Sequence, residues 1–352
     1  MKYNYSIAYI TSNIAPFRVM LLDEMAKNTK SVTLYYFNEI DKGVNPEYVN
    51  KRPNIAQYKS LKNLKKNERR QELLKNDIII FDGYTGKEKL NIMLNLIFRR
   101  KTYFISIDGI IKKNGKDNEL KKIIKSLLFR NSKMIFSTNE ATDKILYSIN
   151  KNLNIKRHIF TTLTSLDFYN IKYLDKNVII NKFNINTDKK IILFVGKFLK
   201  TKGIYELLKT INSKYEYIFV GGTKEELKYT GKEENIRFFK FLEKDEILEL
   251  MKIADVFVLP TYSDVWGLVV IEALSVGLPV VTTDKCNAGL EFIENGVNGY
   301  IIPTKDVNTL NEAIENALKL DKNYVEIINN EKMKKYTLEN SALDILESIS
   351  EG

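Results

Sequence analysis

The chain has 352 residues, of which 44% are hydrophobic, so it is long enough for two domains with buried cores. A single cysteine excludes a disulfide framework, and one cysteine with one histidine leaves too few ligands for a structural zinc site. The net charge of +11 fits a solvated surface or attraction to an anionic membrane, and no zinc-finger or aromatic RNA-binding pattern indicates nucleic acid.

Targeting signals are not recognisable in the chain. No run of about 18 apolar residues is present, so we expect no membrane span. No secretory signal follows Met1, and sparse cysteine agrees with a reducing compartment. We therefore expect a cytoplasmic protein, with any membrane contact peripheral and at the inner face of the plasma membrane.

Short apolar runs alternate with amphipathic helical stretches in the first half of the chain. This alternation predicts a parallel sheet covered on both faces, with ligands beyond the carboxyl ends of its strands. The polar stretch 38–64 is expected to be a long excursion near a cleft mouth. Strands are expected at residues 6–10, 31–37, 77–81, 102–107, 133–137 and 158–162, and helices at 19–27, 89–98, 119–129 and 141–148.

A second alternating series follows a polar stretch. We expect an N-terminal Rossmann-like domain at 1–170, a linker at 171–189, a C-terminal Rossmann-like domain at 190–334, and a helix at 335–352 that packs back on the N-terminal domain. In the second series, strands are expected at 190–195, 216–220, 235–239, 256–259, 280–283 and 299–302, and helices at 204–212, 244–253, 268–276, 289–294 and 309–320, with one or two helices at 332–349.

The stretch 254–279, ADVFVLPTYSDVWGLVVIEALSVGLP, combines the features of an anion site. An apolar strand ends at Pro260, a polar loop carries Asp264, and a helix carries Glu272 eight positions later before Gly277 stops it. A strand, a polar loop and a helix N-terminus suit an anion such as a diphosphate. An acid farther along could accept hydrogen bonds from sugar hydroxyls.

Two lysines lie near a second such turn. Lys197 follows Gly196 at the end of a strand, and Lys202 precedes a helix that opens at Gly203. The spacing is not that of a Walker loop. Taken alone, the pattern fits either a diphosphate site or two solvated lysines.

Three segments together resemble a known family. VGKFLKTKG, the stretch from ADVFVLP to GLPVVTT, and NGVNGYIIP are similar, in order and spacing over about 191–303, to the donor-binding half of family 4 retaining glycosyltransferases. The start of the chain, with PFR before a helix, looks like members that build bacterial surface polysaccharides. The resemblance implies the α/β GT-B fold, in which two Rossmann-like domains with parallel sheets face a cleft.

The resemblance also implies roles for residues of the second half. Lys202, and Lys197 where the family usually has arginine, would hold the donor diphosphate beside Gly196. Glu272 would bind the nucleotide ribose, and Asp264, in place of the family's first glutamate, would face the transferred sugar. Backbone N–H groups for the phosphate or sugar would come from Trp266, Gly267 and Leu268, although the Trp266 ring could simply pack.

The implied reaction is retaining, metal-independent transfer of a sugar from a UDP- or GDP-sugar to a glycan or polyprenyl-linked acceptor, in capsule, O-antigen or glycolipid synthesis. No cofactor beyond the donor is implied. The implied catalytic residues are Asp264, Glu272 and Asp108, although Asp108 could equally be a turn residue before Gly109. Asn13 and Arg18 are the candidate acceptor contacts, with Arg18 meeting an anionic acceptor phosphate.

Three alternatives stay open at this point. A nucleotide-sugar epimerase or a non-catalytic sugar-nucleotide-binding protein could share the architecture. The basic helix at 119–130 could pack its apolar face on the sheet or contact anionic lipid.

Overall fold

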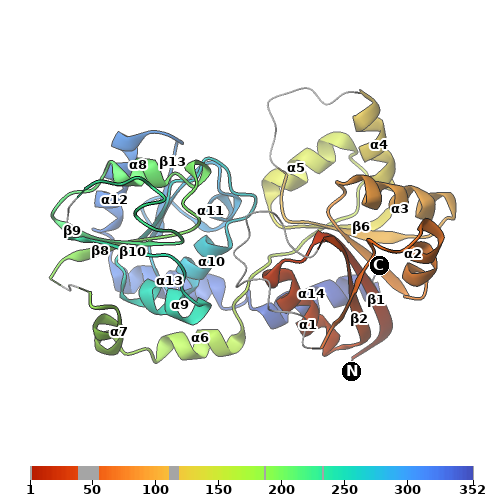
Figure 1. Cartoon of the computed structure of the whole chain (residues 1–352), viewed down its shortest axis with the longest axis horizontal. Helices are drawn as coiled ribbons and strands as arrows, with labels where there is room; N and C mark the ends of the chain where they lie inside the picture. The colour runs from red at the N-terminus through yellow and green to blue at the C-terminus, as the bar shows by residue number, and fades with distance from the viewer. Residues whose placement is uncertain (1, 39–54, 111–118, 186–187, 232–233, 352) are drawn as a thin grey trace. The chain divides into compact units, whose positions relative to one another are not determined.

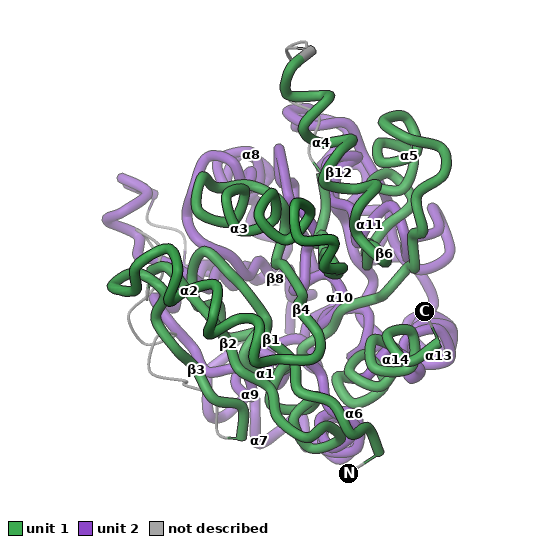
Figure 2. Tube along the Cα trace, turned by 90° about the vertical axis from the view of Figure 1, so that its right-hand side faces the viewer, with its two compact units in different colours: residues 1–162, 338–352 green, residues 163–337 purple. Residues whose placement is uncertain are grey.

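A computed structural model of the protein describes residues 2–38, 55–110, 119–185, 188–231 and 234–351. The chain divides into two compact units (Figure 2): unit 1 comprises Met1–Thr162 and Leu338–Gly352, and unit 2 comprises Leu163–Thr337. Each unit is a parallel sheet with helices on its faces, as in Rossmann-like folds. The predicted fold class is therefore confirmed for both units. No helix among the described residues is long and apolar enough to cross a membrane.

Unit 1 contains a seven-stranded sheet of order β3-β2-β1-β4-β5-β6-β7, in which all neighbours are parallel. Its central strands β1, β4 and β5 are buried over most of their length, because both faces of the sheet are covered. The strands are β1 (Tyr3–Asn13), β2 (Thr29–Asn38), β3 (Gln57–Ser60), β4 (Ile78–Asp82), β5 (Tyr103–Ile107), β6 (Ser132–Ser137) and β7 (Ile155–Arg157).

Helices cover both faces of this sheet. Figure 1 shows α3, α4 and α5 on one face and α1 and α14 on the other. Ala8 and Ile10 of the sheet belong to the same hydrophobic core as Leu128 and Phe129 of α4, so this core lies between the sheet and the helices α3, α4 and α5. The helices are α1 (Pro16–Ala26), α2 (Lys66–Leu73), α3 (Lys87–Phe98), α4 (Glu119–Arg130), α5 (Glu140–Ile149) and α14 (Leu338–Glu351).

The C-terminal helix α14 packs against α1 within unit 1. The Tyr5 hydroxyl donates to the Leu346 carbonyl (3.0 Å), and the Ser341 hydroxyl donates to the Ile159 carbonyl (2.9 Å). His158, which is buried, lies with Nδ1 3.1 Å from Asp344 Oδ2. These contacts give the lone histidine a structural place between the sheet and α14.

Unit 2 contains a six-stranded parallel sheet of order β10-β9-β8-β11-β12-β13. Its strands are β8 (Lys190–Val195), β9 (Tyr215–Val220), β10 (Ile236–Phe239), β11 (Val256–Leu259), β12 (Val280–Thr283) and β13 (Gly299–Ile302). Its helices are α6 (Ser165–Lys172), α7 (Lys176–Phe183), the 3₁₀ turn η2 (Lys200–Lys202), α8 (Ile204–Leu208), α9 (Lys244–Ile253), α10 (Leu268–Ser275), α11 (Asn287–Phe292), α12 (Val307–Ala317) and α13 (Lys322–Met333).

The expected linker at 171–189 lies inside unit 2, and the unit boundary falls at Leu163. The stretch is polar, but one of its polar residues is the N-cap of a helix, and the cap of another helix lies just before it. Thr164 and Asp167 form a capping box at α6, and the Asp175 side chain caps α7. Both helices then pack against α9.

Several expected elements differ in length or were missed. The expected strand at 158–162 is wrong, because pairing with β6 ends at Arg157. The expected helix at 204–212 ends at Leu208, where the hydrogen bonds change to the i→i+3 type. The edge strand β3 and the helix α2 were missed because both are polar and largely exposed. Of the expected excursion at 38–64, residues 39–54 lie outside the described residues.

Candidate functional site

The loops that follow β8 and β11 meet at the carboxyl edge of the unit 2 sheet. The Tyr262 N–H donates to the Thr201 carbonyl (2.8 Å), and the Thr261 hydroxyl donates to the same oxygen (2.9 Å). Gly203 allows this approach, because a Cβ there would lie 1.8 Å from the Pro260 carbonyl oxygen. Its φ of +72° is also in the left-handed region that glycine adopts at little cost. The two loops therefore depend on glycine at this position.

Gly203→Ala is expected to destabilise the protein by about 3 kcal/mol or more, since backbone strain and overpacking each cost about 1–3 kcal/mol. The matched control is Gly296→Ala, where φ is +78° but the nearest atom to a new Cβ is the Tyr300 hydroxyl at 3.9 Å. That control measures the loss of stability from the positive φ alone, which is expected to be about 1 kcal/mol. Urea unfolding of both variants measures the difference, and equal losses would contradict the close contact at Pro260.

The structure brings Lys202 and Asp264 together at this edge. Lys202 Nζ lies 2.6 Å from Asp264 Oδ2, and the two side chains are 27% and 14% exposed. Asp264 is fixed by its backbone, whose N–H donates to the Lys285 carbonyl (2.9 Å). A partly exposed pair of this kind contributes about 1 kcal/mol or less. The Asp264 carboxylate therefore positions the Lys202 ammonium group. An incoming anion can replace the carboxylate as the partner of the ammonium group at a small cost in free energy.

The N-terminus of α10 adjoins this pair. Gly267, the N-cap residue, has φ of +95°, and a Cβ there would lie 2.6 Å from Cys286 Sγ and 3.8 Å from Asp264 Cγ. No side chain caps the helix, and the Val270 and Ile271 N–H groups donate to the Gly267 carbonyl, so the N–H groups of Leu268 and Val269 are the ones that face a ligand. Free N–H groups, the helix dipole and the Lys202 ammonium together suit an anion. Glu272 lies half-buried in the second turn of the same helix.

The other expected donor residues lie around this edge with different degrees of burial. Gly196 follows β8, and Lys197 after it is exposed. The Trp266 side chain is buried and packs edge-on against Phe292, so the indole is part of the core and not of a site wall. Behind it, burial raises the pKa of the Cys286 thiol to about 12, so the cysteine is an inert packing group.

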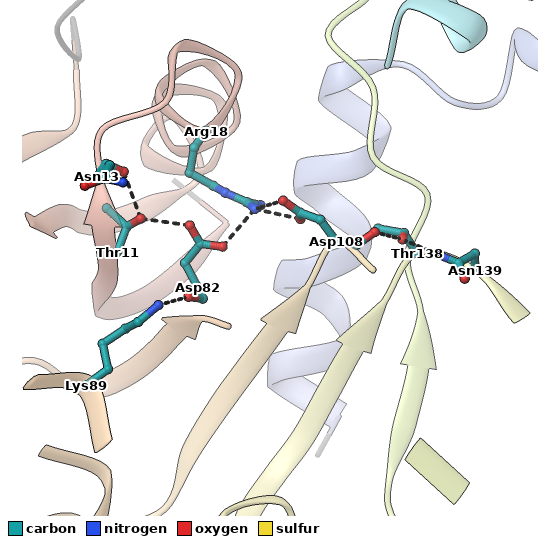
Figure 3. Close-up of polar contacts among 8 residues, drawn as sticks. All are labelled: Thr11, Asn13, Arg18, Asp82, Lys89, Asp108, Thr138 and Asn139. Carbon is teal, nitrogen blue, oxygen red and sulfur yellow. Dashed lines mark hydrogen bonds and ion pairs between the residues drawn. The ribbon is translucent and has the colours of Figure 1, made fainter. Parts of the chain in front are cut away.

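A second polar cluster occupies the carboxyl edge of the unit 1 sheet (Figure 3). Arg18, in the first turn of α1, is only 2% exposed. Its Nη2 donates to both carboxylate oxygens of Asp108 (2.7 and 2.8 Å) and to Asp82 Oδ1 (3.0 Å). Burial lowers the pKa of Arg18, but Asp108 and Asp82 raise it by more, so the guanidinium stays charged.

Further groups support these two carboxylates. The Thr11 hydroxyl donates to Asp82 Oδ2 (2.8 Å), and the buried Lys89 ammonium donates to the Asp82 carbonyl. Burial lowers the pKa of Lys89 below its usual range, although Asp82 opposes the shift. The hydroxyl of Thr138, which follows the neighbouring strand β6, donates to the carbonyl of Asp108. Both carboxylates thus have fixed positions at the strand ends.

The expectation that Arg18 meets an acceptor phosphate needs correction, since its guanidinium is buried and points at two carboxylates of its own unit. Asn13, the other expected acceptor residue, ends β1 and accepts from Asn38 Nδ2 (3.2 Å). Asp82 was recognisable as a strand-end residue but was not selected. Lys89 has no sequence signal, because a lysine at a helix start is ordinarily on the surface.

Comparisons with known proteins agree with this arrangement. Residues 175–334 match the model of the family "Glycosyl transferases group 1". The chain is 27% identical, over 69% of its length and 66% of the relative's, to the Campylobacter jejuni N,N'-diacetylbacillosaminyl-diphospho-undecaprenol alpha-1,3-N-acetylgalactosaminyltransferase. It is 29% identical, over 40% of each chain, to the capsular polysaccharide biosynthesis glycosyltransferase CapM of Staphylococcus aureus.

A solved structure extends the similarity in fold to the whole chain. The structure of HepE from Anabaena in complex with UDP superposes with a TM-score of 0.76, at 15% identity and over 100% of both chains. The curated relatives, in contrast, are matched over at most two thirds of their length. The family match covers most of unit 2, including β8, β11, Lys202, Asp264 and Glu272. Through this unit, the chain is similar to the group 1 glycosyl transferases.

Proposed function

We propose that this protein is a glycosyltransferase that moves a sugar from a nucleotide-diphosphate sugar to a glycan or lipid-linked acceptor. The observation that carries the proposal is the Lys202–Asp264 pair beside the uncapped N-terminus of α10. HepE, similar in fold, has been solved with UDP and with UDP-glucose. Both curated relatives are named as glycosyltransferases, which favours transfer over epimerisation.

In the proposed reaction, the bond between the anomeric carbon and the diphosphate breaks, a bond to an acceptor oxygen forms, and the proton of that oxygen passes to the leaving phosphate. Negative charge grows on the leaving diphosphate. The Lys202 ammonium and the N–H groups at the start of α10 stabilise this charge in place of a metal ion. Glu272 accepts hydrogen bonds from the ribose, Asp264 contacts the transferred sugar, and the anomeric configuration is retained.

Donor hydrolysis tests the proposal. We expect one of the UDP- or GDP-sugars in a panel to be hydrolysed slowly without acceptor, to undergo no epimerisation, and to release its sugar with the anomeric configuration retained, as followed by proton NMR. Rates should be unchanged by EDTA. Conversion of the donor into another intact nucleotide sugar would favour an epimerase, and no turnover with tight nucleotide binding would favour a non-catalytic protein.

We further propose that unit 1 contacts an anionic membrane through α4. Leu128 and Phe129 of this helix are buried, but Leu120 and Ile123 on its other side are 62% and 63% exposed. The exposed Lys121 lies between them. Exposed apolar side chains flanked by lysine suit the interface of a membrane that contains anionic lipid. Such contact would bring the enzyme to a lipid-linked acceptor.

Replacing Leu120 and Ile123 with glutamine is expected to weaken binding to phosphatidylglycerol-containing vesicles by about tenfold or more, because each side chain loses its apolar burial. The matched control is the Leu166→Gln, Val178→Gln double variant, which removes equally exposed side chains from unit 2. Vesicle sedimentation gives the measurement, with phosphatidylcholine vesicles as the neutral reference. Equal binding of both double variants would reject the role of α4.

A further inference from the structure

The cluster in unit 1 contains a buried cation whose partners are better exposed than it is. Arg18 is 2% exposed, whereas the Asp82 and Asp108 side chains are 24% and 28% exposed. The face that a ligand can reach therefore presents carboxylate oxygens, with the positive charge behind them. Figure 3 shows the Arg18 side chain reaching from α1 to both carboxylates.

Arg18 is held in this orientation by aromatic rings. Its guanidinium carbon lies 5.4 Å from the ring centre of Tyr9, 5.2 Å from that of Phe17 and 5.6 Å from that of Phe160. These rings stabilise the cation while they surround it. A side chain so enclosed, with its Nη2 already donating to both carboxylates, does not swing out to meet a ligand.

The two carboxylates come from neighbouring strands. Asp82 ends β4 opposite Ser106 of β5, and Asp108 lies two residues farther along the chain, so the strand pairing places both carboxylates at the same edge of the sheet. Two carboxylates that share one position repel each other unless a cation lies between them. Arg18 is that cation, and its Nη2 donates to both carboxylates, a placement that the differently shaped lysine side chain would not reproduce.

We propose that Arg18 is a positioning residue that fixes Asp82 and Asp108 as one pair of carboxylates, and that this pair binds hydroxyl groups of an uncharged sugar at the reactive end of the acceptor. Carboxylates accept strong hydrogen bonds from hydroxyls and repel phosphate. The inference rests on the proposed transferase function, because it names the chemistry of the acceptor. It also adds Asp82 to the acceptor-binding residues.

Saturation-transfer NMR on the full chain tests the binding without requiring turnover. The probes are the methyl glycosides of glucose, galactose and N-acetylglucosamine, and the phosphorylated forms of the same sugars. We expect at least one methyl glycoside to bind, and its phosphorylated form to bind about tenfold more weakly or not at all. Equal or tighter binding of a phosphorylated sugar, or no binding of any neutral glycoside, would overturn the proposal.

Variants then locate the binding. Asp82→Asn should weaken binding of that methyl glycoside by about tenfold or more, and Arg18→Lys should do the same by releasing one carboxylate. The matched control is Asp143→Asn, which removes another arginine-paired carboxylate of unit 1, bonded to Arg157 at 2.8 Å. Unchanged binding in Asp82→Asn, or equal loss in the control, would contradict the assignment. Thermal melting identifies any variant that is unfolded.

Kinetics separate this inference from the proposed function. With a hydrolysed donor and the bound methyl glycoside as acceptor, Asp82→Asn and Arg18→Lys should lower kcat/KM for the acceptor about tenfold, whereas the control Asp143→Asn should leave both acceptor transfer and donor hydrolysis unchanged. A general structural defect would lower both. If the wild type binds methyl glycosides through Asp82 but hydrolyses no donor, the transferase proposal fails and the carboxylate pair stands as a sugar site.

Discussion

Replacing Lys202 with methionine is expected to lower kcat/KM for the nucleotide-sugar donor by about 100- to 1000-fold, the loss typical of removing one group that stabilises developing charge. The physical reason is that the ammonium lies 2.6 Å from Asp264 Oδ2, beside the uncapped N-terminus of α10. Without Lys202 the Asp264 carboxylate also loses its partner and repels the diphosphate. Steady-state kinetics on the hydrolysed donor give the measurement.

Lys200→Met is the matched control for this prediction. Lys200 lies two positions away in the same 3₁₀ turn and is exposed. Its loss changes the net charge equally but should alter kcat/KM by less than about threefold, since screened surface charges act weakly. Lys202→Arg should recover part of the activity, because it keeps the charge. Similar losses in Lys200→Met and Lys202→Met would show that charge alone, and not position, matters.

Glu272→Ala is expected to lower turnover by about 100-fold or more, provided that the hydrogen bonds to the ribose strengthen in the transition state. Glu272 lies half-buried one turn after the start of α10, so its side chain is near the expected donor phosphates and within a rigid element. Alanine is a good helix former, so the helix itself should be kept. Turnover at saturating donor is the quantity to measure.

The control is Glu312→Ala, which removes an exposed glutamate from α12 of the same unit. It should leave turnover unchanged. Glu272→Gln keeps an acceptor oxygen and should lie between the wild type and Glu272→Ala. Near-normal turnover of a folded Glu272→Ala protein would refute the assigned role.

Much of the fold was predictable because it follows from periodicity. The apolar runs that became β8, β9, β11 and β12 lie within one or two residues of their expected places, and Pro260 ends β11 as expected. Polar elements were harder to predict. The N-cap of α7 is Asp175, and an aspartate at such a position is equally typical of a loop. Only the packing of α7 on α9 shows that the stretch is a helix.

The positions of the candidate site residues relative to one another were predictable only for residues that lie in one continuous segment. Asp264, Gly267 and Glu272 belong to one strand–loop–helix unit, so their order alone placed them at one edge of the sheet. The pairing of Lys202 with Asp264, 62 positions apart, depends on how two loops meet. Arg18 was expected to face a ligand, and no local pattern indicates that an arginine turns inward to two carboxylates.

Isothermal titration of the wild-type protein with UDP, GDP and ADP tests the central claim, that unit 2 holds a nucleotide diphosphate at Lys202 and the N-terminus of α10. We expect one of these nucleotides to bind with a dissociation constant in the micromolar range, typical of enzyme substrates, and Lys202→Met to weaken it by at least about tenfold. Absence of binding by all three nucleotides, or equal binding by Lys202→Met, would contradict it.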